Sequence, residues 1–250
     1  TGSTQVGSLL IKECADLVIR TSMELGGNAP FVVLEDADIP AAVAGAMVAK
    51  MRNGGSACTS ANRFYVHKKV AKEFTAGMAA AMGALKLAPG MEAGAQLGAT
   101  VSVKERNKIA ELVDTAVASG GKIETGGVIP EGSGAFYPPT VLTVDQANPI
   151  LDFEIFGPVA PIVEIESDAE AIRLANASPY GLISYVYSSD LKRALKVAES
   201  IESGMVAINR GVISDPAAPF GGYKSSGLGR EGGFDGIHEF LEKKYIGVEI

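Results

Sequence analysis

One cysteine, Cys58, lies among residues that could support nucleophilic chemistry. The run 53–62 around it contains only glycine, alanine, hydroxyl and amide residues, with no large apolar side chain that could bury the thiol. Glycines let the backbone approach a bound molecule closely, and free N–H groups can stabilise a thiolate. Cys58 is therefore a candidate nucleophile, and an incidental thiol on a surface loop is the alternative.

Two acidic segments could supply the other groups that such a nucleophile needs. Glu24 stands beside paired glycines between two apolar runs, where α/β sheets often bind ligands; the alternative is a solvated turn residue. In segment 152–158, acidic and aromatic residues alternate, which places Glu154 and Phe156 on one side of an extended chain. An acceptor and a ring together suit a ribose with its base, whereas a half-buried edge strand is the alternative.

The first segment of the chain predicts a helix with a polar N-terminus. Apolar residues between positions 6 and 14 follow helical spacing, and Ser3 or Thr4 is a suitable N-cap. The glycine and hydroxyl groups at this terminus could hold a phosphate. The same spacing places Cys14 on the apolar stripe, so we expect it to be a buried core residue.

The remaining segments predict an α/β fold whose largely parallel sheet is flanked by helices. Helical and strand-like segments alternate with short loops, which is typical of βαβ units. A terminal strand at 245–250 could pair with another subunit. His67 and His238 are expected at the surface, the latter in a short helix, 234–241. Strands are predicted at 17–19, 31–34, 64–67, 123, 141–142, 159–165, 182–187 and 205–208, and helices at 39–51, 74–85, 103–118, 169–175 and 191–201.

Composition excludes several classes of function. A net charge of −7 argues against nucleic acid or an anionic membrane as a partner, and no apolar run reaches the length of a membrane span. The 2 cysteines form no disulfide framework, which favours a cytoplasmic protein, and the 2 histidines leave little material for a metal site. The chain begins at Thr1 without a methionine, so we expect a piece of a longer protein.

Four motifs, in one order, closely resemble the aldehyde dehydrogenase superfamily. Each motif alone is weak, but together they cover nearly the whole chain and are highly specific. Finer details at 50–53, 211–214 and 229–233 look most like the succinate-semialdehyde branch of that family. The four motifs are Glu24-Leu25-Gly26-Gly27, the glycine-rich loop that ends in Cys58, Glu154-Ile155-Phe156-Gly157-Pro158, and the stretch 219–227 (PFGGYKSSG).

The resemblance implies a reaction and its residues. Cys58 would attack the aldehyde carbon to give a thiohemiacetal, its hydride would pass to NAD or NADP, and Glu24 would activate the water that hydrolyses the thioester. For succinate semialdehyde the product is succinate. The Cys58 N–H would donate to the oxyanion. By the same resemblance, Gly2, Ser3, Val6, Leu25, Glu154 and Phe156 would contact the cofactor, with Ser3 at the pyrophosphate; Arg52 and Ser214 would hold the substrate carboxylate, and Phe220 would line the aldehyde tunnel.

The chain also departs from the family pattern. Family members carry a long N-terminal half that includes most of the cofactor fold, and this chain does not contain it. The resemblance therefore implies a remnant of a Rossmann-like cofactor domain at 1–26, an aldehyde-dehydrogenase-like catalytic domain at 27–209, and a C-terminal loop, helix and oligomerisation strand at 210–250. The choice between NAD and NADP stays open, and a homo-oligomer, dimer or tetramer, is expected. Ser60 stands where several relatives of this branch have a second cysteine.

Three alternatives remain on the sequence alone. Another carboxylated semialdehyde could be the substrate, since Arg52 would serve any of them. Cys58 could instead be the nucleophile of a hydrolase, paired with His67 or His238. Finally, the chain as given could be a folded domain that binds no cofactor productively.

Overall fold

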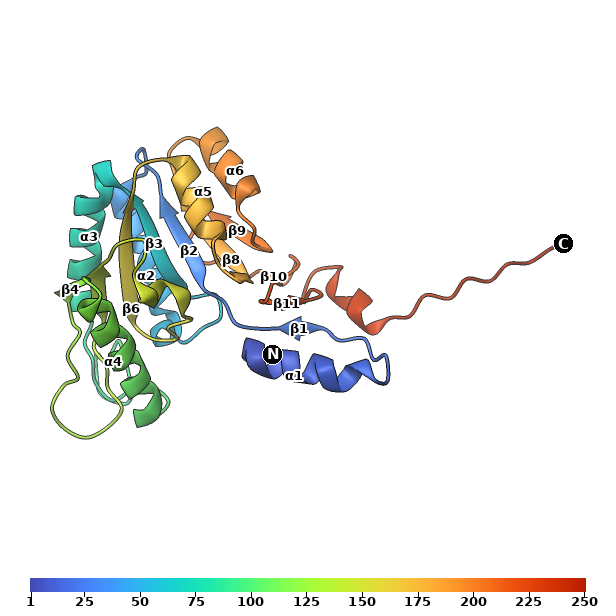
Figure 1. The fold of residues 1–250 in the computed structure, drawn as a ribbon, viewed down its shortest axis with the longest axis horizontal. Coiled ribbons are helices and arrows are strands. Elements are labelled where there is room, and N and C mark those ends of the chain that lie inside the picture. Colours follow the sequence, from blue (N-terminus) through green and yellow to red (C-terminus); the bar gives the residue numbers. More distant parts are fainter.

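A seven-stranded sheet forms the centre of the computed structural model, which describes residues 1–250 (Figure 1). The strand order is β4-β5-β6-β3-β2-β8-β9, and all neighbours are parallel except the antiparallel pair β4–β5. This arrangement confirms the predicted α/β class with a largely parallel sheet. The strands are β2 (Ala29–Val33), β3 (Ala61–His67), β4 (Lys122–Thr125), β5 (Thr140–Thr143), β6 (Val159–Ile165), β8 (Ile183–Tyr187) and β9 (Met205–Ile208).

Helices cover both faces of the sheet because its central strands are apolar on both sides. In β2, Phe31 and Val33 join the core cluster under α2 and α3, whereas Val32 joins the cluster under α4, α5 and α6. Continuous apolar runs of this kind are typical of parallel strands buried on both faces. The helices are α2 (Ile39–Met51), α3 (Lys68–Gly83), α4 (Val103–Ala118), α5 (Asp168–Asn176) and α6 (Leu191–Ser200).

Side-chain caps explain why several helices begin where the sequence predicts. Asp38 accepts a hydrogen bond from the Ala41 N–H at 3.0 Å at the start of α2, and Ser102 accepts one from the Glu105 N–H at 3.2 Å at the start of α4. Such caps satisfy N–H groups that have no partner within the helix. The predicted bounds of these two helices, and of strands β6 and β9, are confirmed.

The two ends of the chain meet beside the main sheet. Helix α1 (Thr4–Ala15) leads to β1 (Met23–Glu24), which pairs antiparallel with β11 (Gly227–Leu228). A second small pair joins β7 (Tyr180–Gly181) to β10 (Tyr223–Lys224). In Figure 1, α1 and β1 therefore lie next to the C-terminal segment, at one end of the sheet. No helix of the chain combines the length and the apolar character that crossing a bilayer requires.

Two predictions for the N-terminal segment are wrong. Residues 17–19 form a turn and coil rather than a strand, and Val18 is 90% exposed. Cys14 is half-buried rather than part of the core, because α1 buries only Gly7, which packs against Leu25. The apolar periodicity identified a helix face correctly, but no element of these 250 residues packs over that face.

The predictions for the C-terminal end and for His67 also need correction. Residues 245–250 form an exposed coil that runs away from the body (Figure 1), because no strand of this chain offers them hydrogen bonds. The predicted helix at 234–241 is a shorter 3-10 helix, Gly236–Phe240, with His238 exposed as expected. His67 is only 5% exposed, because it is the last residue of β3 and pairs with Ile165 of β6. Its ring accepts a hydrogen bond from the Lys69 N–H and so caps α3.

Candidate active site

A cavity of about 490 Å³ brings together residues that the sequence suggested separately. It opens where the N-terminus of α1, the segment after β1, the cysteine loop and the segment around residue 155 meet. Six of the predicted site residues line it, namely Gly2, Ser3, Leu25, Cys58, Glu154 and Phe156; the other lining residues are Thr1, Gly26, Ser56, Ala57, Glu105 and Lys108.

Left-handed backbone shapes the loop that carries Cys58. A 3-10 helix, Arg52–Gly55, follows α2, and its Asn53, Gly54 and Gly55 have φ of 53°, 61° and 78°. Glycine and asparagine adopt such angles at the lowest steric cost. The Asn53 side-chain amide donates to the Ser56 carbonyl at 2.8 Å, which closes the turn. The glycine-rich composition is thus needed to turn the chain out of α2.

The Cys58 thiol is half-buried at the edge of the core cluster under α2 and α3. Burial raises the pKa of this thiol above its ordinary value, and the charges of Glu154 and Glu24 raise it further. The backbone N–H groups of Cys58 and Thr59 act in the opposite direction but do not offset the other effects. The N–H donors expected from the sequence are therefore present, yet the thiol rests protonated, with two carboxylates near enough to influence it.

Glu24 is a buried carboxylic acid rather than a solvated turn residue. Its β-strand position fixes the backbone, its side chain is 5% exposed, and Oε2 has no hydrogen-bond partner. Burial, followed by the charge of Glu231, raises the pKa of Glu24 to about 7, while Arg230 opposes the shift. A carboxyl group with this pKa is suited to accept a proton near neutrality.

Glu154 is held by the backbone of the Glu24 segment. Its Oε1 accepts a hydrogen bond from the Gly27 N–H at 3.0 Å. Burial raises the pKa of Glu154, whereas the Gly27 N–H, Lys108 and Lys50 lower it. The residues after the 3-10 helix Pro149–Asp152 form coil, so the edge-strand alternative is wrong. Phe156, at 41% exposed, also lines the cavity.

Helix α1 contributes its N-terminus to the cavity. The Ser3 hydroxyl caps the helix by accepting from the Val6 N–H at 3.3 Å, and the Gly2 N–H donates to the Glu24 carbonyl at 3.0 Å. Free N–H groups at a helix N-terminus favour an anionic ligand. The Val6 side chain is 50% exposed and does not line the cavity, unlike the other predicted cofactor residues.

The predicted substrate residues do not share one cavity. Ser214 and Phe220 line a separate cavity of about 200 Å³ at the C-terminal segment. Arg52 is exposed and donates to the Thr59 hydroxyl at 3.2 Å, so it lies against the cysteine loop, but it lines neither cavity. Phe220 and Cys58 both pack against the apolar core cluster under α2 and α3.

Two lining residues escaped the sequence analysis. Glu105 and Lys108 line the 490 Å³ cavity from the first turns of α4, and the charge of Lys108 lowers the pKa of Glu154, as does that of the buried Lys50. Their spacing of three along a helix places them on one face. Nothing in the local sequence distinguishes this pair from ordinary solvated helix residues, because their role depends on what α4 packs against.

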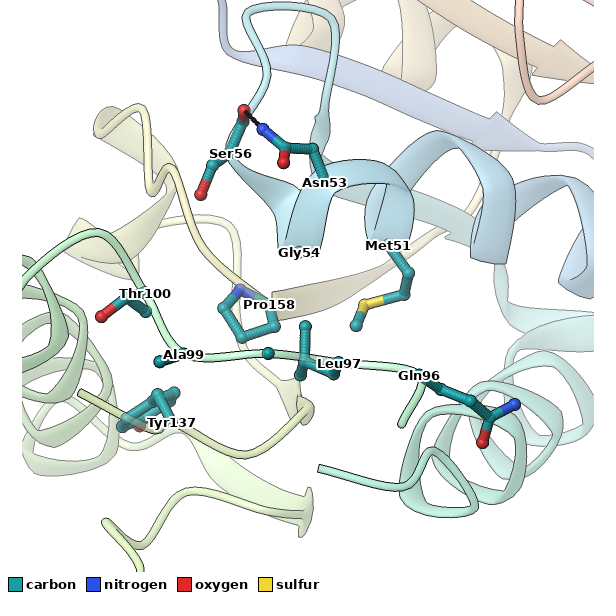
Figure 2. Close-up of a pocket in the computed structure, with 11 residues that line it drawn as sticks. Met51, Asn53, Gly54, Ser56, Gln96, Leu97, Ala99, Thr100, Tyr137 and Pro158 are labelled. Carbon is teal, nitrogen blue, oxygen red and sulfur yellow. Dashed lines mark hydrogen bonds between the residues drawn. The ribbon is translucent and has the colours of Figure 1, made fainter. Parts of the chain in front are cut away.

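A further cavity, of about 290 Å³, lies behind the cysteine loop (Figure 2). In Figure 2, Met51, Asn53 and Gly54 lie on one side, with Leu97, Ala99 and Thr100 crossing below them. It shares only Ser56 with the 490 Å³ cavity, and it contains no cysteine, carboxylate or cation. Its hydroxyl groups are those of Ser56, Thr100 and Tyr137, and burial raises the pKa of Tyr137 to about 12, so this phenol keeps its proton near neutrality.

The hydrolase alternative requires a histidine beside Cys58, and the geometry does not supply one. His67, the N-cap of α3, has its Nε2 3.1 Å from the Glu166 carbonyl oxygen. His238 is exposed on the C-terminal 3-10 helix. Neither histidine lines the cavity that contains the thiol.

Comparison with known proteins gives one consistent result. The model of the family described as "Aldehyde dehydrogenase family" matches residues 1–246. The chain is 55% identical over 249 residues to a succinate-semialdehyde dehydrogenase of Paenarthrobacter nicotinovorans, covering 99% of this chain and 55% of that protein. It is 44% identical to a glutarate-semialdehyde dehydrogenase of Pseudomonas putida, covering 100% of this chain and 52% of that protein.

A solved structure agrees with these sequence matches. The crystal structure of an E. coli NADP-dependent enzyme superposes with a TM-score of 0.95 at 41% identity, covering 98% of this chain and 51% of that chain. The chain therefore spans about half the length of the proteins that it matches.

Replacing Gly27 by alanine tests the contact between the Glu24 segment and the cysteine loop. A Cβ on Gly27 would lie 2.2 Å from the Cys58 carbonyl oxygen, so Gly27→Ala must displace the loop. We expect a loss of about 1–3 kcal/mol in the free energy of unfolding and an altered rate of Cys58 alkylation. Gly90→Ala is the matched control, because nothing lies within 4 Å of its Cβ position. Equal stability and alkylation in both variants would contradict the contact.

The raised pKa of Glu24 predicts a pH-dependent effect on stability. Between its ordinary pKa of 4.5 and its pKa of about 7 in the fold, the folded chain binds a proton that the unfolded chain does not. The contribution of Glu24 to stability is therefore lost as the pH rises through this range. Relative to the wild type, Glu24→Gln should gain stability from about pH 5 to about pH 8 in chemical unfolding. Glu249→Gln, in the exposed tail, should show no such trend; parallel curves for Glu24→Gln and the wild type would refute the burial argument.

Proposed function

This chain belongs to the aldehyde dehydrogenase family, and we propose that it forms the catalytic half of an NAD(P)-dependent dehydrogenase that oxidises a carboxylated semialdehyde, in first place succinate semialdehyde, to the acid. The observation that carries the proposal is the 490 Å³ cavity. It places Cys58, the carboxylate of Glu154 and the N-terminus of α1 around one space, within electrostatic reach of Glu24.

The residues around the cavity fit a nicotinamide dinucleotide. The free N–H groups near Ser3 suit a pyrophosphate, and the Glu154 carboxylate, oriented by the Gly27 N–H, suits a ribose hydroxyl. Phe156 and Leu25 add apolar surface beside them. Lys108 adds a cation on the same wall. When bound, such a cofactor supplies the acceptor for a hydride. The names of two relatives specify NADP(+), and NAD is the alternative for this chain.

In the first half of the proposed reaction, Cys58 must lose its proton. The raised pKa of the thiol means that a base has to take this proton, and the Glu24 carboxyl, with a pKa of about 7, can hold it. The thiolate then forms a bond to the aldehyde carbon, and the N–H groups of Cys58 and Thr59 donate to developing negative charge. Loss of the hydride leaves a thioester on the same sulfur.

In the second half, water must replace the sulfur at the acyl carbon. Glu24 must first pass the thiol proton to solvent, which its pKa of about 7 permits near neutrality. One oxygen of this buried carboxylate lacks a partner, so a water molecule can donate to that oxygen and be deprotonated by it. The Cys58 sulfur is then the leaving group and the carboxylic acid is released. Each step uses groups that lie on the Glu24 segment or on the cysteine loop.

The substrate class rests on Arg52 and on the second cavity. Arg52 stands at the entry to the cysteine loop, fixed by the Thr59 hydroxyl, and its planar fork matches a carboxylate. Ser214, which lines the second cavity, would hold the carboxylate together with Arg52, and Phe220 in the same cavity would line the path of the aldehyde. Glutarate semialdehyde and related aldehydes are alternatives that the same arginine would serve.

The chain spans about half the length of its relatives. We propose that residues 1–26 are a remnant of a cofactor-binding domain, that 27–209 form the catalytic domain, and that 210–250 contribute to assembly. The exposed apolar residues of the tail, such as Tyr245, Ile246 and Val248, suit a homo-oligomer. Both cysteines are free thiols, which suits a cytoplasmic protein.

The proposal is tested by replacing the nucleophile. Cys58→Ser should reduce aldehyde-dependent formation of NAD(P)H by at least about a thousandfold, because a hydroxyl is a weaker nucleophile than a thiol. The free energy of unfolding should not change, because serine keeps nearly the volume of the cysteine side chain. The measurement follows reduced cofactor spectroscopically, in this chain and in a form that includes an N-terminal half. Cys14→Ser is the control and should retain the activity. Equal turnover in Cys58→Ser would end the assignment.

A second variant tests the substrate class. Arg52→Leu should raise KM for succinate semialdehyde by roughly 10- to 100-fold, the cost of losing a charge-assisted pair, and should leave KM for an uncharged aldehyde of the same length nearly unchanged. Steady-state kinetics with both aldehydes measure the difference. Arg173→Leu, on the far helix α5, is the control. A similar increase in KM for both aldehydes would remove Arg52 from carboxylate recognition.

A further inference from the structure

Lys50 is a fully buried lysine next to the cysteine loop. It is the penultimate residue of α2, and its exposed fraction is 0%. The other buried residues of this helix are apolar and mostly small, namely Ile39, Ala42, Ala46 and Ala49. A lysine is rarely buried completely unless it has partners that justify the loss of its hydration.

The hydrogen-bond partners of the Lys50 ammonium are residues that follow Cys58 in the sequence. Its Nζ donates to the Asn62 Oδ1 at 2.8 Å and to the Ser60 hydroxyl at 3.3 Å, and the Ser60 hydroxyl donates back to the Lys50 carbonyl at 3.4 Å. Lys50 and Ser60 thus join the two ends of the loop that carries Cys58, from the interior side. Ser60 is further fixed by its N–H, which donates to the Ala57 carbonyl at 2.9 Å.

The electrostatic setting of Lys50 is unusual, because none of its direct partners is charged. Burial lowers the pKa of Lys50 to about 7, and the charge of Glu154 is the one that works against this shift. In the other direction, Lys50 helps to lower the pKa of Glu154. The lysine therefore changes its charge near neutrality, within electrostatic reach of a carboxylate that lines the cavity.

We propose that Lys50 is a positioning residue: its buried ammonium ties the end of α2 to residues 60–62 and so fixes the cysteine loop, and it acts together with Lys108 as a counter-charge of Glu154. This role rests on the proposed function, because it gives the loop and Glu154 their importance. Lys50 lines none of the three cavities described above, so it acts through Ser60, Asn62 and Glu154 rather than on a substrate.

A lysine that merely filled space would behave differently. Methionine has nearly the same length and no charge, so a space-filling role predicts that Lys50→Met preserves the loop at every pH. A positioning ammonium predicts that the loop depends on the charge, because a charge-assisted hydrogen bond is roughly twice as strong as a neutral one.

The test is backbone hydrogen exchange of the loop in this chain, without cofactor or substrate. In the wild type, an opening that releases the Ser60 N–H breaks the bonds from the Lys50 Nζ while the lysine side chain stays buried, so this opening costs more when Lys50 is charged. The Ser60 N–H should therefore lose protection by about fivefold, after correction for the intrinsic rate, between pH values about one unit below and above 7, as Lys50 loses its proton. Lys50→Met should be less protected at both pH values and show no transition. Lys72→Met, exposed on α3, is the control and should behave as the wild type.

Equilibrium unfolding gives a second readout with a defined sign. Because the pKa of Lys50 is lowered in the fold, the folded wild type binds fewer protons than the unfolded chain between pH about 7 and 10.5. Wild-type stability relative to Lys50→Met should therefore increase as the pH rises through this interval. A flat difference, or a loop transition that persists in Lys50→Met, would overturn the proposal.

A second variant keeps the test decisive if Lys50→Met does not fold. Asn62→Asp places a carboxylate 2.8 Å from the ammonium and should raise the pKa of Lys50, so the exchange transition of Ser60 should move to higher pH. An unmoved transition would also overturn the proposal. Both readouts use the chain alone, so they are independent of the aldehyde kinetics that test the proposed function.

Discussion

The close approach of the backbone at Gly26 and Gly27 to the cysteine loop is the contact on which the rest of the site depends. The Gly27 α-carbon packs so closely against the Cys58 carbonyl that no side chain fits between them, and its N–H orients Glu154. The neighbouring Gly26 carbonyl accepts from the Ser226 hydroxyl at 2.7 Å, which fastens the C-terminal segment to the same point. The cysteine loop, the segment of Glu154 and the C-terminal segment, which are far apart in sequence, therefore all contact the backbone of two glycines. The geometry of the site depends on these contacts.

A balance of buried charge follows from this geometry. Glu24, Glu154 and Cys58 are all partly or fully removed from water, and burial raises the pKa of each. Isolated buried carboxylates are costly, so the nearby cations have a clear physical purpose: Lys108 on the cavity wall and Lys50 behind it both favour the ionised form of Glu154. Among these groups the pKa of Glu24 is raised to about 7, so this carboxyl can take up and release a proton near neutrality at little cost, which is the property that a general base requires.

The arrangement also explains why the site joins the two ends of the chain. Glu24 lies on β1, which has only β11 as a partner, so the position of the proposed base depends on residues 227–228. Main-sheet strands hold Cys58 on one side, where the Tyr185 hydroxyl donates to the Thr59 carbonyl at 2.8 Å. The positions of the proposed catalytic groups thus depend on the pairing of β1 with β11 as well as on the main sheet.

The sequence by itself determined the elements and the identity of the chemical groups. Helices 39–51 and 103–118 and strands 159–165 and 205–208 were predictable because caps, periodicity and apolar runs are local properties, and the order of the glycine-rich and acidic motifs singled out Cys58, Glu24 and Glu154. Only the tertiary structure decided which of these residues and segments are buried and which are exposed. It left Cys14 and the tail at 245–250 partly or fully exposed, buried His67 and Lys50, and turned Glu105 and Lys108 toward the cavity. Burial and pKa depend on which distant segments pack together, and a local pattern contains no record of that packing.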